Sequence, residues 1–422
     1  MESDHHLSSM DHATNTCCTI AATKQPTQIW VAGSVIIGAG PSGLAVAASL
    51  QLHSIPSLIL ERSNSIASLW RHHTYDRLHL HQPKRFCQLP HLPFPPHFPN
   101  YPSKHHFLSY LLSYSHFFSL RPLFGHNVID ARYDAAHSVW RVTTTHSSPE
   151  FADTVEFVSR WLVVATGENA EPVLPELPGI QTFLHEKKAV HSADYKTGED
   201  YRGKKVLVVG CGNSGMEVCL DLCQHGALPF MSVRSGVHVL PIEMFGMSTF
   251  GLATKLLKWF PVRFVDRFLL MMAGRMIGDT EKYGLKRPKV GPLELKNTRG
   301  RTPVLDVGTL DNIKNGRIKI LPEVECLTSN GARFVDGREM DFDSLVFATG
   351  YKSNFPSWLK DWEDFTEDGK PKSPFANGWK GENGLYFVGF TGRGLLGASS
   401  DAVNIALDIA ERQTEEVISP IH

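Results

Sequence analysis

Two stretches of this chain join a run of apolar residues to a glycine-rich turn, and together they decide its fold. They are Val35-Ile36-Ile37-Gly38-Ala39-Gly40-Pro41-Ser42-Gly43 and Val206-Leu207-Val208-Val209-Gly210-Cys211-Gly212-Asn213-Ser214-Gly215. In each, glycines with the spacing G-x-G-x-x-G follow a predicted buried strand directly. This arrangement is typical of a turn that binds the pyrophosphate of a dinucleotide. Two such turns on one chain predict two dinucleotides brought face to face.

The residues around the first turn complete a β-α-β unit. We predict a buried strand at Ile29–Ile37, a helix at Gly43–His53 and a second strand at Ser57–Glu61. The first glycine permits the tight turn, the second lets the backbone approach the pyrophosphate, and the third lets the helix pack closely on the strand. The helix N-terminus favours the phosphate charge. The strand after the helix ends in an acid, Glu61, 23 residues after Gly38.

Glu61 indicates which dinucleotide the first turn takes. A carboxylate accepts hydrogen bonds from a ribose 2′-hydroxyl and repels a 2′-phosphate. The first unit therefore suits the adenosine half of FAD. The predicted contacts to FAD come from Gly38, Ala39, Gly40, Pro41, Ser42, Gly43 and Glu61.

The second unit repeats this pattern with one change. A predicted strand at Lys204–Val209 leads into the turn and a helix at Met216–His225, and the next strand, Phe230–Val233, ends in Arg234 instead of an acid. A cation at this place suits a 2′-phosphate, so NADPH is favoured over NADH. An exposed arginine at a strand end is the alternative interpretation. The predicted contacts to NADPH come from Gly210, Cys211, Gly212, Asn213, Ser214, Gly215 and Arg234.

Three later strands point to the way the units are assembled. Leu162–Gly167 and Leu345–Gly350 are similar apolar runs that end in Ala-Thr-Gly, and Gly384–Gly389 is followed by a glycine-rich loop and a helix. Backbone amides at such a junction suit the pyrophosphate and ring edge of a flavin.

The predicted fold is an α/β flavoprotein with two dinucleotide-binding domains. A flexible leader, residues 1–28, precedes an FAD-binding Rossmann-like domain made of residues 29–195 and 340–422. An NADPH-binding Rossmann-like domain, residues 196–339, is inserted between them and carries a helical insertion around residues 244–296.

Composition limits the partners and the compartment. The chain has 422 residues and a net charge of −1, so nothing indicates a nucleic-acid partner. Seven cysteines lack the spacing of a disulfide framework or a metal site, which fits a reducing compartment. The leader lacks the apolar core of a secretory signal, and Phe268–Gly274 is too short to span a bilayer. We expect a soluble, cytoplasmic protein, with peripheral contact to the cytosolic face of the endoplasmic reticulum left open. The oligomeric state is also left open.

Two apolar regions have no assigned chemistry. Residues 244–296 are expected to form the core of an insertion packed on the NADPH domain, while a substrate lid and a weak membrane-surface contact are the alternatives. The apolar residues that indicate helices there are Leu252, Leu256, Leu257, Phe260, Phe268, Leu269, Met271 and Met272. The proline-rich stretch Pro83–Pro122 is predicted to be a long irregular crossover.

Beyond these motifs, the chain resembles the class B flavin monooxygenases, in particular their plant YUCCA-type branch, from about Val35 to Ala410. The similar segments are Tyr75–Lys84, Trp161–Asn169, Val208–Glu217, Phe347–Lys352 and Gly389–Ala402. The turns alone occur in many flavoproteins. Their combination with Ala-Thr-Gly-Glu-Asn and Gly-Arg-Gly-Leu-Leu-Gly-Ala is much more specific.

The resemblance implies a reaction in which NADPH reduces FAD and dioxygen adds to the reduced flavin as a hydroperoxide. In the YUCCA branch this species attacks the keto carbon of indole-3-pyruvate, an aromatic 2-oxo acid, and loss of carbon dioxide gives the auxin indole-3-acetate. Because the flavin carries the chemistry, no protein nucleophile is required. By analogy, Asn169 is the candidate polar group near the flavin and the nicotinamide. An asparagine in an ordinary turn is the alternative.

The chain departs from the family pattern before the second turn. The family signature Phe-x-Gly-x-x-x-His-x-x-x-(Tyr/Phe) is matched at His191 and Tyr195, but His185 stands at the phenylalanine place and Lys187 at the glycine place. This puts NADP⁺ retention in doubt, unless the segment is a surface loop that tolerates an insertion. His81 stands where many nitrogen- and sulfur-oxygenating relatives have Asn, which favours a carbon-centred substrate; a packed histidine is the other interpretation.

Other functions remain open from the sequence. A flavin monooxygenase acting on an amine or sulfide would share every motif above. A disulfide reductase would share both nucleotide units but needs a redox dithiol such as Cys-x-x-Cys, which the sequence lacks. A poorly coupled or non-catalytic flavoprotein acting as a redox sensor could follow from the altered signature.

Overall fold

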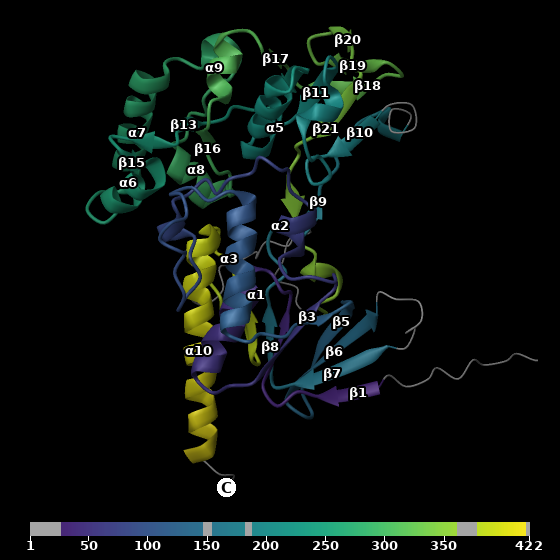
Figure 1. Ribbon diagram of the computed structural model, residues 1–422, viewed down its shortest axis with the longest axis vertical. Coiled ribbons are helices and arrows are strands. Elements are labelled where there is room, and N and C mark those ends of the chain that lie inside the picture. Colours follow the sequence, from purple (N-terminus) through teal and green to yellow (C-terminus); the bar gives the residue numbers. More distant parts are fainter. Residues whose placement is uncertain (1–26, 147–153, 182–187, 361–377, 419–422) are drawn as a thin grey trace, which may run out of the picture.

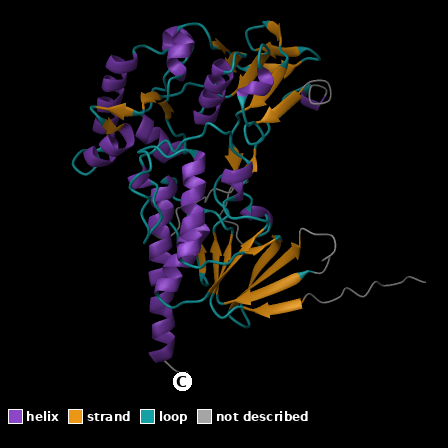
Figure 2. Ribbon diagram, in the orientation of Figure 1, coloured by secondary structure: helices purple, strands orange, loops and turns teal. Residues whose placement is uncertain are grey.

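Two parallel five-stranded sheets organise the structure, a computed structural model that describes residues 27–146, 154–181, 188–360 and 378–418. Figure 1 shows one sheet in the lower part of the view and the other in the upper part, with loops and short strands between them. Both sheets are covered by helices, as Figure 2 shows by secondary structure. The predicted α/β fold with two separate Rossmann-like units is confirmed by this topology.

The first sheet has the strand order β23-β8-β2-β3-β4. Its strands are β2 (Ser34–Ile37), β3 (Ser57–Glu61), β4 (Leu123–Phe124), β8 (Trp161–Val164) and β23 (Leu385–Phe387). One face packs against α1 (Pro41–Leu52), α3 (Lys104–Phe117) and α10 (Gly394–Ile418). The other face packs against a second sheet of order β1-β7-β6-β5. Segments from both ends of the chain therefore build one layered unit.

The strand predicted at Ile29–Ile37 is two strands in the structure. β1 (Thr27–Trp30) is exposed and pairs with β7 (Val155–Ser159), while β2 begins at Ser34 and is fully buried. The sheet of β1 and β7 also contains β5 (His126–Asp134) and β6 (Val139–His146). Thr27 and Gln28, which the sequence placed in the flexible leader, belong to β1, and the Gln28 amide donates to Glu156 (2.9 Å). The rest of the leader lies outside the described residues.

The second sheet has the order β10-β21-β11-β12-β17. Its strands are β10 (Lys188–His191), β11 (Lys205–Val209), β12 (Leu228–Ser232), β17 (Lys319–Leu321) and β21 (Ser344–Phe347). Helices α5 (Asn213–Gln224) and α9 (Thr309–Lys314) pack on one face. A meander of β18 (Val324–Leu327), β19 (Gly331–Phe334) and β20 (Glu339–Asp341) packs on the other.

The two units are joined by a narrow antiparallel bridge. β9 (Glu171–Pro172) pairs with β22 (Tyr351–Lys352), directly after the two Ala-Thr-Gly turns. β10 and β21 pair in the second sheet, although the predicted division placed both in the FAD-binding domain. The domain division remains a prediction, and we propose that its boundaries lie at this bridge, because the strand pairing changes sheets there.

The insertion around residues 244–296 contains three helices: α6 (Thr249–Leu256), α7 (Val262–Ile277) and α8 (Pro292–Arg299). It also contains the hairpin β14 (Glu243–Met244) and β15 (Met247–Ser248), next to the pair β13 (Val239–Pro241) and β16 (Val304–Asp306). Leu252 and Leu269 are buried in a small core of its own, as expected. Leu257, Phe260 and Met271 are exposed, so the prediction that they belong to a core is wrong.

The crossover predicted to be irregular at Pro83–Pro122 holds the 14-residue helix α3. Ser103 caps its N-terminus, and Phe107, Tyr110, Leu111 and Tyr114 are buried against the first sheet's helices. The prolines lie before α3 begins, except Pro122, which follows its end, so none of them interrupts the helix. Short helical segments elsewhere are α2 (Ser68–His72), η1 (Lys84–Phe86), η3 (Gly198–Tyr201), η4 (Glu281–Tyr283) and η5 (Phe355–Ser357).

Within the described part of the chain, none of the helices has both the length and the apolar character needed to cross a membrane.

Candidate functional site

A large cavity opens at the carboxyl ends of β2, β3 and β8, the place where open α/β sheets bind ligands. Its volume is about 1310 Å³, including the solvent at its mouth. The lining includes Gly38, Gly40, Pro41, Ser42, Glu61 and Asn169 from the predicted site. Gly389, Gly394, Leu395 and Ala398 from the C-terminal loop and α10 also line it. The structure thus brings the first turn, the Ala-Thr-Gly-Glu-Asn segment and the C-terminal loop to one cavity.

The three glycines of the first turn have different steric roles. Gly38 has φ +110°, and a Cβ there would lie 2.7 Å from the Ala165 carbonyl oxygen. A Cβ on Gly43 would lie 1.9 Å from the Gly38 carbonyl oxygen, so only glycine lets α1 start this close to the turn. A Cβ on Gly40 would meet no atom within 4 Å. Packing does not require glycine at position 40, which fits a position kept open for a ligand.

The second turn repeats this geometry. Gly210 has φ +115° and its Cβ would lie 2.4 Å from the Ala348 carbonyl oxygen, while a Cβ on Gly215 would lie 2.1 Å from the Gly210 oxygen. Gly212 again has open space around it. Neither α1 nor α5 has a side-chain N-cap, so no capping side chain competes with a phosphate for the backbone N–H groups at these helix N-termini. Both turns fit a dinucleotide pyrophosphate.

Glu61 is buried at the end of β3 and is held by the backbone. Its carboxylate accepts hydrogen bonds from the amides of Ala39 and Ser63, each at 2.9 Å. These bonds aim the carboxylate at the cavity that the first turn lines. The position fits the role in binding a ribose hydroxyl that the sequence predicted, which remains a prediction.

The C-terminal loop is anchored by a residue that sequence reasoning missed. Asp401 of α10 is fully buried, and its carboxylate accepts a hydrogen bond from the amide of Gly389 (3.2 Å). Arg393 lies 3.5 Å from the other carboxylate oxygen. Burial raises the pKa of Asp401 to about 6, against the opposing effect of these partners. The signal available in the sequence was one acid on the otherwise apolar face of the last helix.

Asn169 lies on the cavity wall beside Glu168. The turn that carries it is fixed by Ser353, whose hydroxyl donates to the Gly167 carbonyl (3.1 Å). Lys296 of α8 interacts electrostatically with Glu168, and burial lowers the pKa of Lys296. The insertion therefore contributes a cation near this wall of the cavity.

Arg234 is exposed at the end of β12, and a second arginine lies at the same loop. Arg301 donates from Nη2 to the Ser235 hydroxyl (2.8 Å) and to the Gly236 carbonyl (3.0 Å). Burial raises the pKa of Cys211 in the second turn, and the positive charge of Arg301 opposes this rise. The sequence showed only Arg234, because Arg301 is 67 residues further along the chain. The loop is suited to a phosphate.

The remaining residues of the second turn are placed around α5. Asn213 uses its side-chain oxygen to accept from the Leu305 amide (3.1 Å), which ties the turn to β16. Ser214 is near enough to Tyr75 for a side-chain hydrogen bond between them. Asn213 therefore has a structural contact in addition to the predicted cofactor contact.

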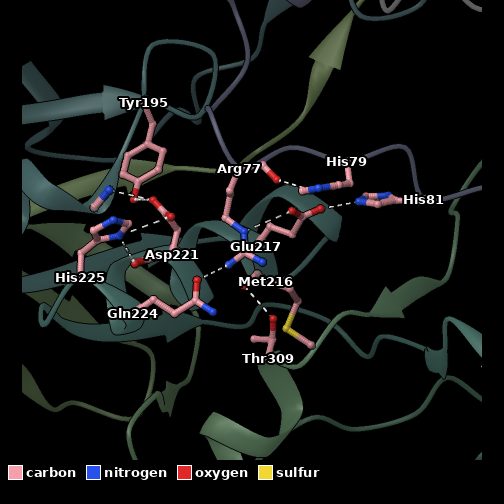
Figure 3. Close-up of polar contacts among 11 residues, drawn as sticks. Arg77, His79, His81, Tyr195, Met216, Glu217, Asp221, Gln224, His225 and Thr309 are labelled. Carbon is pink, nitrogen blue, oxygen red and sulfur yellow. Dashed lines mark hydrogen bonds and ion pairs between the residues drawn. The ribbon is translucent and has the colours of Figure 1, made fainter. Parts of the chain in front are cut away.

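Helix α5 carries two buried carboxylates, Glu217 and Asp221, and Figure 3 shows them with their partners. Glu217 holds a segment of the first unit, and Asp221 holds the segment between β10 and β11 of the second unit itself. Glu217 forms a hydrogen bond with His81 and lies 3.7 Å from Arg77 Nε, and both partners come from residues 73–82, between α2 and the Pro83–Pro122 crossover. Only 5% of the Glu217 side chain is exposed. Arg77 also donates to Gln224 at the end of α5 (3.1 Å). A buried carboxylate needs such partners, so the segment at residues 73–82 of the first unit is fastened to the helix of the second turn.

Asp221, one turn later on α5, holds the connection after β10. It accepts from the Tyr195 hydroxyl (2.6 Å) and from the Gly198 amide (2.7 Å), as Figure 3 shows for Tyr195. Burial and the nearby carboxylate raise the pKa of Tyr195. His191 is buried with its ring against Tyr351 (5.0 Å), and burial lowers its pKa. Phe183–Lys187, the altered part of the family signature, lies outside the described residues.

The described residues include no group of three or more His, Cys, Asp or Glu side chains placed to hold a metal ion.

Two dinucleotide-type turns on separate parallel sheets, joined by a short bridge, define the class of two-dinucleotide flavoproteins. The chain belongs to the flavin-binding monooxygenase-like family, whose model matches residues 32–364. It is 61% identical over 388 residues to the indole-3-pyruvate monooxygenase YUCCA8 of Oryza sativa, covering 91% of this chain and 92% of that protein. It is 56% identical to the probable indole-3-pyruvate monooxygenase YUCCA4 of Arabidopsis thaliana, covering 92% of each. The resemblance to the YUCCA branch is confirmed.

Among solved structures, the chain is similar to OTEMO in complex with FAD and NADP. The TM-score is 0.70 at 16% identity, and the match covers 93% of this chain and 86% of that one. At this identity the likeness supports the fold alone.

Alanine substitutions at two glycines separate packing from cofactor binding. Gly43→Ala places a methyl group against a backbone oxygen, and overpacking of this kind costs about 1–3 kcal/mol, so we expect a lower melting temperature. Gly40→Ala meets open space, so the flavin-free protein should melt like the wild type while losing affinity for FAD. Thermal melting of flavin-free protein and flavin titration measure the two effects. Full flavin affinity in Gly40→Ala would contradict the assignment of the first turn.

Proposed function

We propose that this chain is an NADPH-dependent flavin monooxygenase that converts indole-3-pyruvate to indole-3-acetate, a step in auxin biosynthesis. The observation that carries the proposal is the 61% identity, across nearly the whole chain, to an indole-3-pyruvate monooxygenase. Both turns and both Ala-Thr-Gly segments lie within residues 32–364, which the family model matches. The overall conversion consumes the 2-oxo acid, dioxygen, NADPH and a proton, and it yields the shorter acid, carbon dioxide, water and NADP⁺.

The residues present fit both cofactors. FAD would be held with its pyrophosphate at Gly38–Gly43, its ribose at Glu61 and its isoalloxazine end near the C-terminal loop. NADPH would be held with its pyrophosphate at Gly210–Gly215 and its 2′-phosphate near Arg234 and Arg301. Bound flavin, once reduced, supplies the chemistry that activates dioxygen.

The protein's own residues have to orient the cofactors and limit the access of water. Asp401 holds the Gly389 amide at the cavity, and Ser353 holds the turn before Asn169, so both cavity edges are preorganised. Asn169 is proposed as a polar group close to the reacting atoms because it lies on the cavity wall. Glu217 fastens the segment between α2 and α3 of the first unit to α5, and Asp221 fastens the segment between β10 and β11 to the same helix. None of these side chains is required to act as a nucleophile.

A cytoplasmic location remains a prediction. It rests on the scattered cysteines, and those that the structure describes, Cys87, Cys211, Cys219, Cys223 and Cys326, carry free thiols.

Aerobic turnover tests the proposed reaction directly. Purified protein with FAD, NADPH and indole-3-pyruvate should form indole-3-acetate in amounts close to the NADPH consumed, with little hydrogen peroxide, because a closed site protects the oxygenating species from water. Gly40→Ala, which should bind FAD poorly, is the matched control. Peroxide without the acid product would reject indole-3-pyruvate as the substrate and favour an amine, a sulfide or an uncoupled flavoprotein.

Removing the Arg234 side chain should weaken the preference for NADPH over NADH. In Arg234→Ala, the KM for NADPH is expected to rise roughly ten- to a hundredfold, because a charge-assisted hydrogen bond to the 2′-phosphate contributes about 1.5–3 kcal/mol. The KM for NADH, which has no such phosphate, should stay the same. Arg317→Ala removes another exposed arginine, after α9, and serves as the control. An equal change for both nucleotides would mean that Arg234 does not contact the 2′-phosphate.

A further inference from the structure

The tip formed by α6, α7 and the residues between them exposes large apolar side chains. Trp259 is 83% exposed and Phe264 is 51% exposed, and their neighbours Leu257, Phe260 and Met271 are exposed as well. The rings of Phe260 and Phe264 stack with centroids 4.8 Å apart. We call these five residues, together with the cations between them, the α6–α7 surface. An exposed aromatic cluster of this kind indicates an interaction site, since single exposed apolar residues are common but contiguous ones are not.

The α6–α7 surface is not an unfilled part of the core. Helix α7 is two-sided: Val265, Leu269 and Ala273 are buried in the insertion's own core. Phe264 and Met271 lie on the opposite, exposed side. None of the residues that line the cavity at the first turn belongs to α6 or α7, so nothing about that cavity requires the aromatic side chains to be exposed.

The exposed charged side chains of residues 249–277 are all positive. Residues 249–277 contain a single acid, Asp266, in a chain whose net charge is −1. Asp266 is buried and accepts hydrogen bonds from the amides of Leu293 (2.8 Å) and Glu294 (3.1 Å) at the start of α8. The exposed cations of the region are Lys255, Lys258, Arg263, Arg267 and Arg275. One of these cations, Arg263, lies 4.0 Å from the carboxylate of Glu294 on α8.

This pattern of aromatic residues framed by cations matches one kind of partner. Tryptophan and phenylalanine insert at the boundary between headgroups and acyl chains, and lysine and arginine reach back to anionic headgroups along their apolar stems. Each cation near an anionic leaflet adds to the binding. Figure 1 shows α6 and α7 at the outer left edge of the molecule, away from the first sheet, so a flat surface can approach them.

We propose that the α6–α7 surface docks this protein on the headgroup region of an anionic lipid bilayer. The contact is peripheral: the aromatic side chains enter the interface, and the cations bind acidic headgroups. This inference does not depend on the proposed reaction, and its test does not use turnover.

Vesicle flotation of the full-length, FAD-loaded protein tests the proposal. At low salt, the protein should float with vesicles of phosphatidylcholine and phosphatidylserine and stay behind with phosphatidylcholine alone, and added salt should release it. Two variants probe the two parts of the surface: Trp259→Ser with Phe264→Ser, and Lys258→Glu with Arg263→Glu. Each should weaken binding by at least about tenfold.

The matched controls alter comparable residues elsewhere. Phe117→Ser removes an aromatic side chain of α3 that is 64% exposed, and Arg317→Glu reverses an exposed cation after α9. Both should bind vesicles like the wild type, and flavin content should be equal in all variants.

Three results would overturn the proposal. The wild type could fail to float with anionic vesicles at low salt, or the surface variants could float as well as the controls. In the third result, the wild type would bind no lipid and would be a dimer, and the variant Trp259→Ser with Phe264→Ser would be a monomer. This result would identify a second copy of this chain as the partner of the α6–α7 surface.

Discussion

A buried carboxylate on the helix of the second turn constrains how the two units sit together. Glu217 is almost fully enclosed, and an unpaired charge in such a place costs several kcal/mol. Its partners, His81 and Arg77, are not on its own unit but on the segment between α2 and α3 of the first one. The charge of Glu217 is therefore satisfied only when the units are docked in one orientation. Asp221 on the same helix accepts from Tyr195, which follows β10 of the second sheet, so this contact fixes α5 within its own unit.

The nucleotide sites use one steric device twice. In each turn the first glycine lies against the alanine of an Ala-Thr-Gly segment, Ala165 or Ala348, and the third glycine lies against the first. Each Ala-Thr-Gly segment then runs into the β9–β22 bridge. The packing that shapes each phosphate turn is thus continuous with the packing that joins the units. Hydride transfer between two bound cofactors depends on continuous packing of this kind, because small displacements of reacting groups have large effects on rate.

Much of this arrangement could be predicted from the sequence, because the turns are local. The spacing of glycines after an apolar strand determines their conformation, so the turns and β3 follow from a few neighbouring residues. The sheet to which β10 and β21 belong could not be predicted from local sequence. The strands β8 and β21 both end in Ala-Thr-Gly, and this similarity gives no signal that β21 joins the second sheet and β8 the first. Asp401, Arg301 and Glu217 were missed for the same reason. Each acts on residues that are near in space but 12 to 136 positions away in sequence.

The most direct test of this account is the rate of anaerobic flavin reduction by saturating NADPH, compared between the wild type and Glu217→Gln. The wild-type flavin should be reduced promptly. The variant, which removes the charge but keeps the size, should contain the same amount of FAD and reduce it at least about tenfold more slowly, because the nicotinamide and the flavin are no longer held in register. A wild-type flavin that stays oxidised, or equal rates in both proteins, would contradict the claim that Glu217 positions two cofactor sites for hydride transfer.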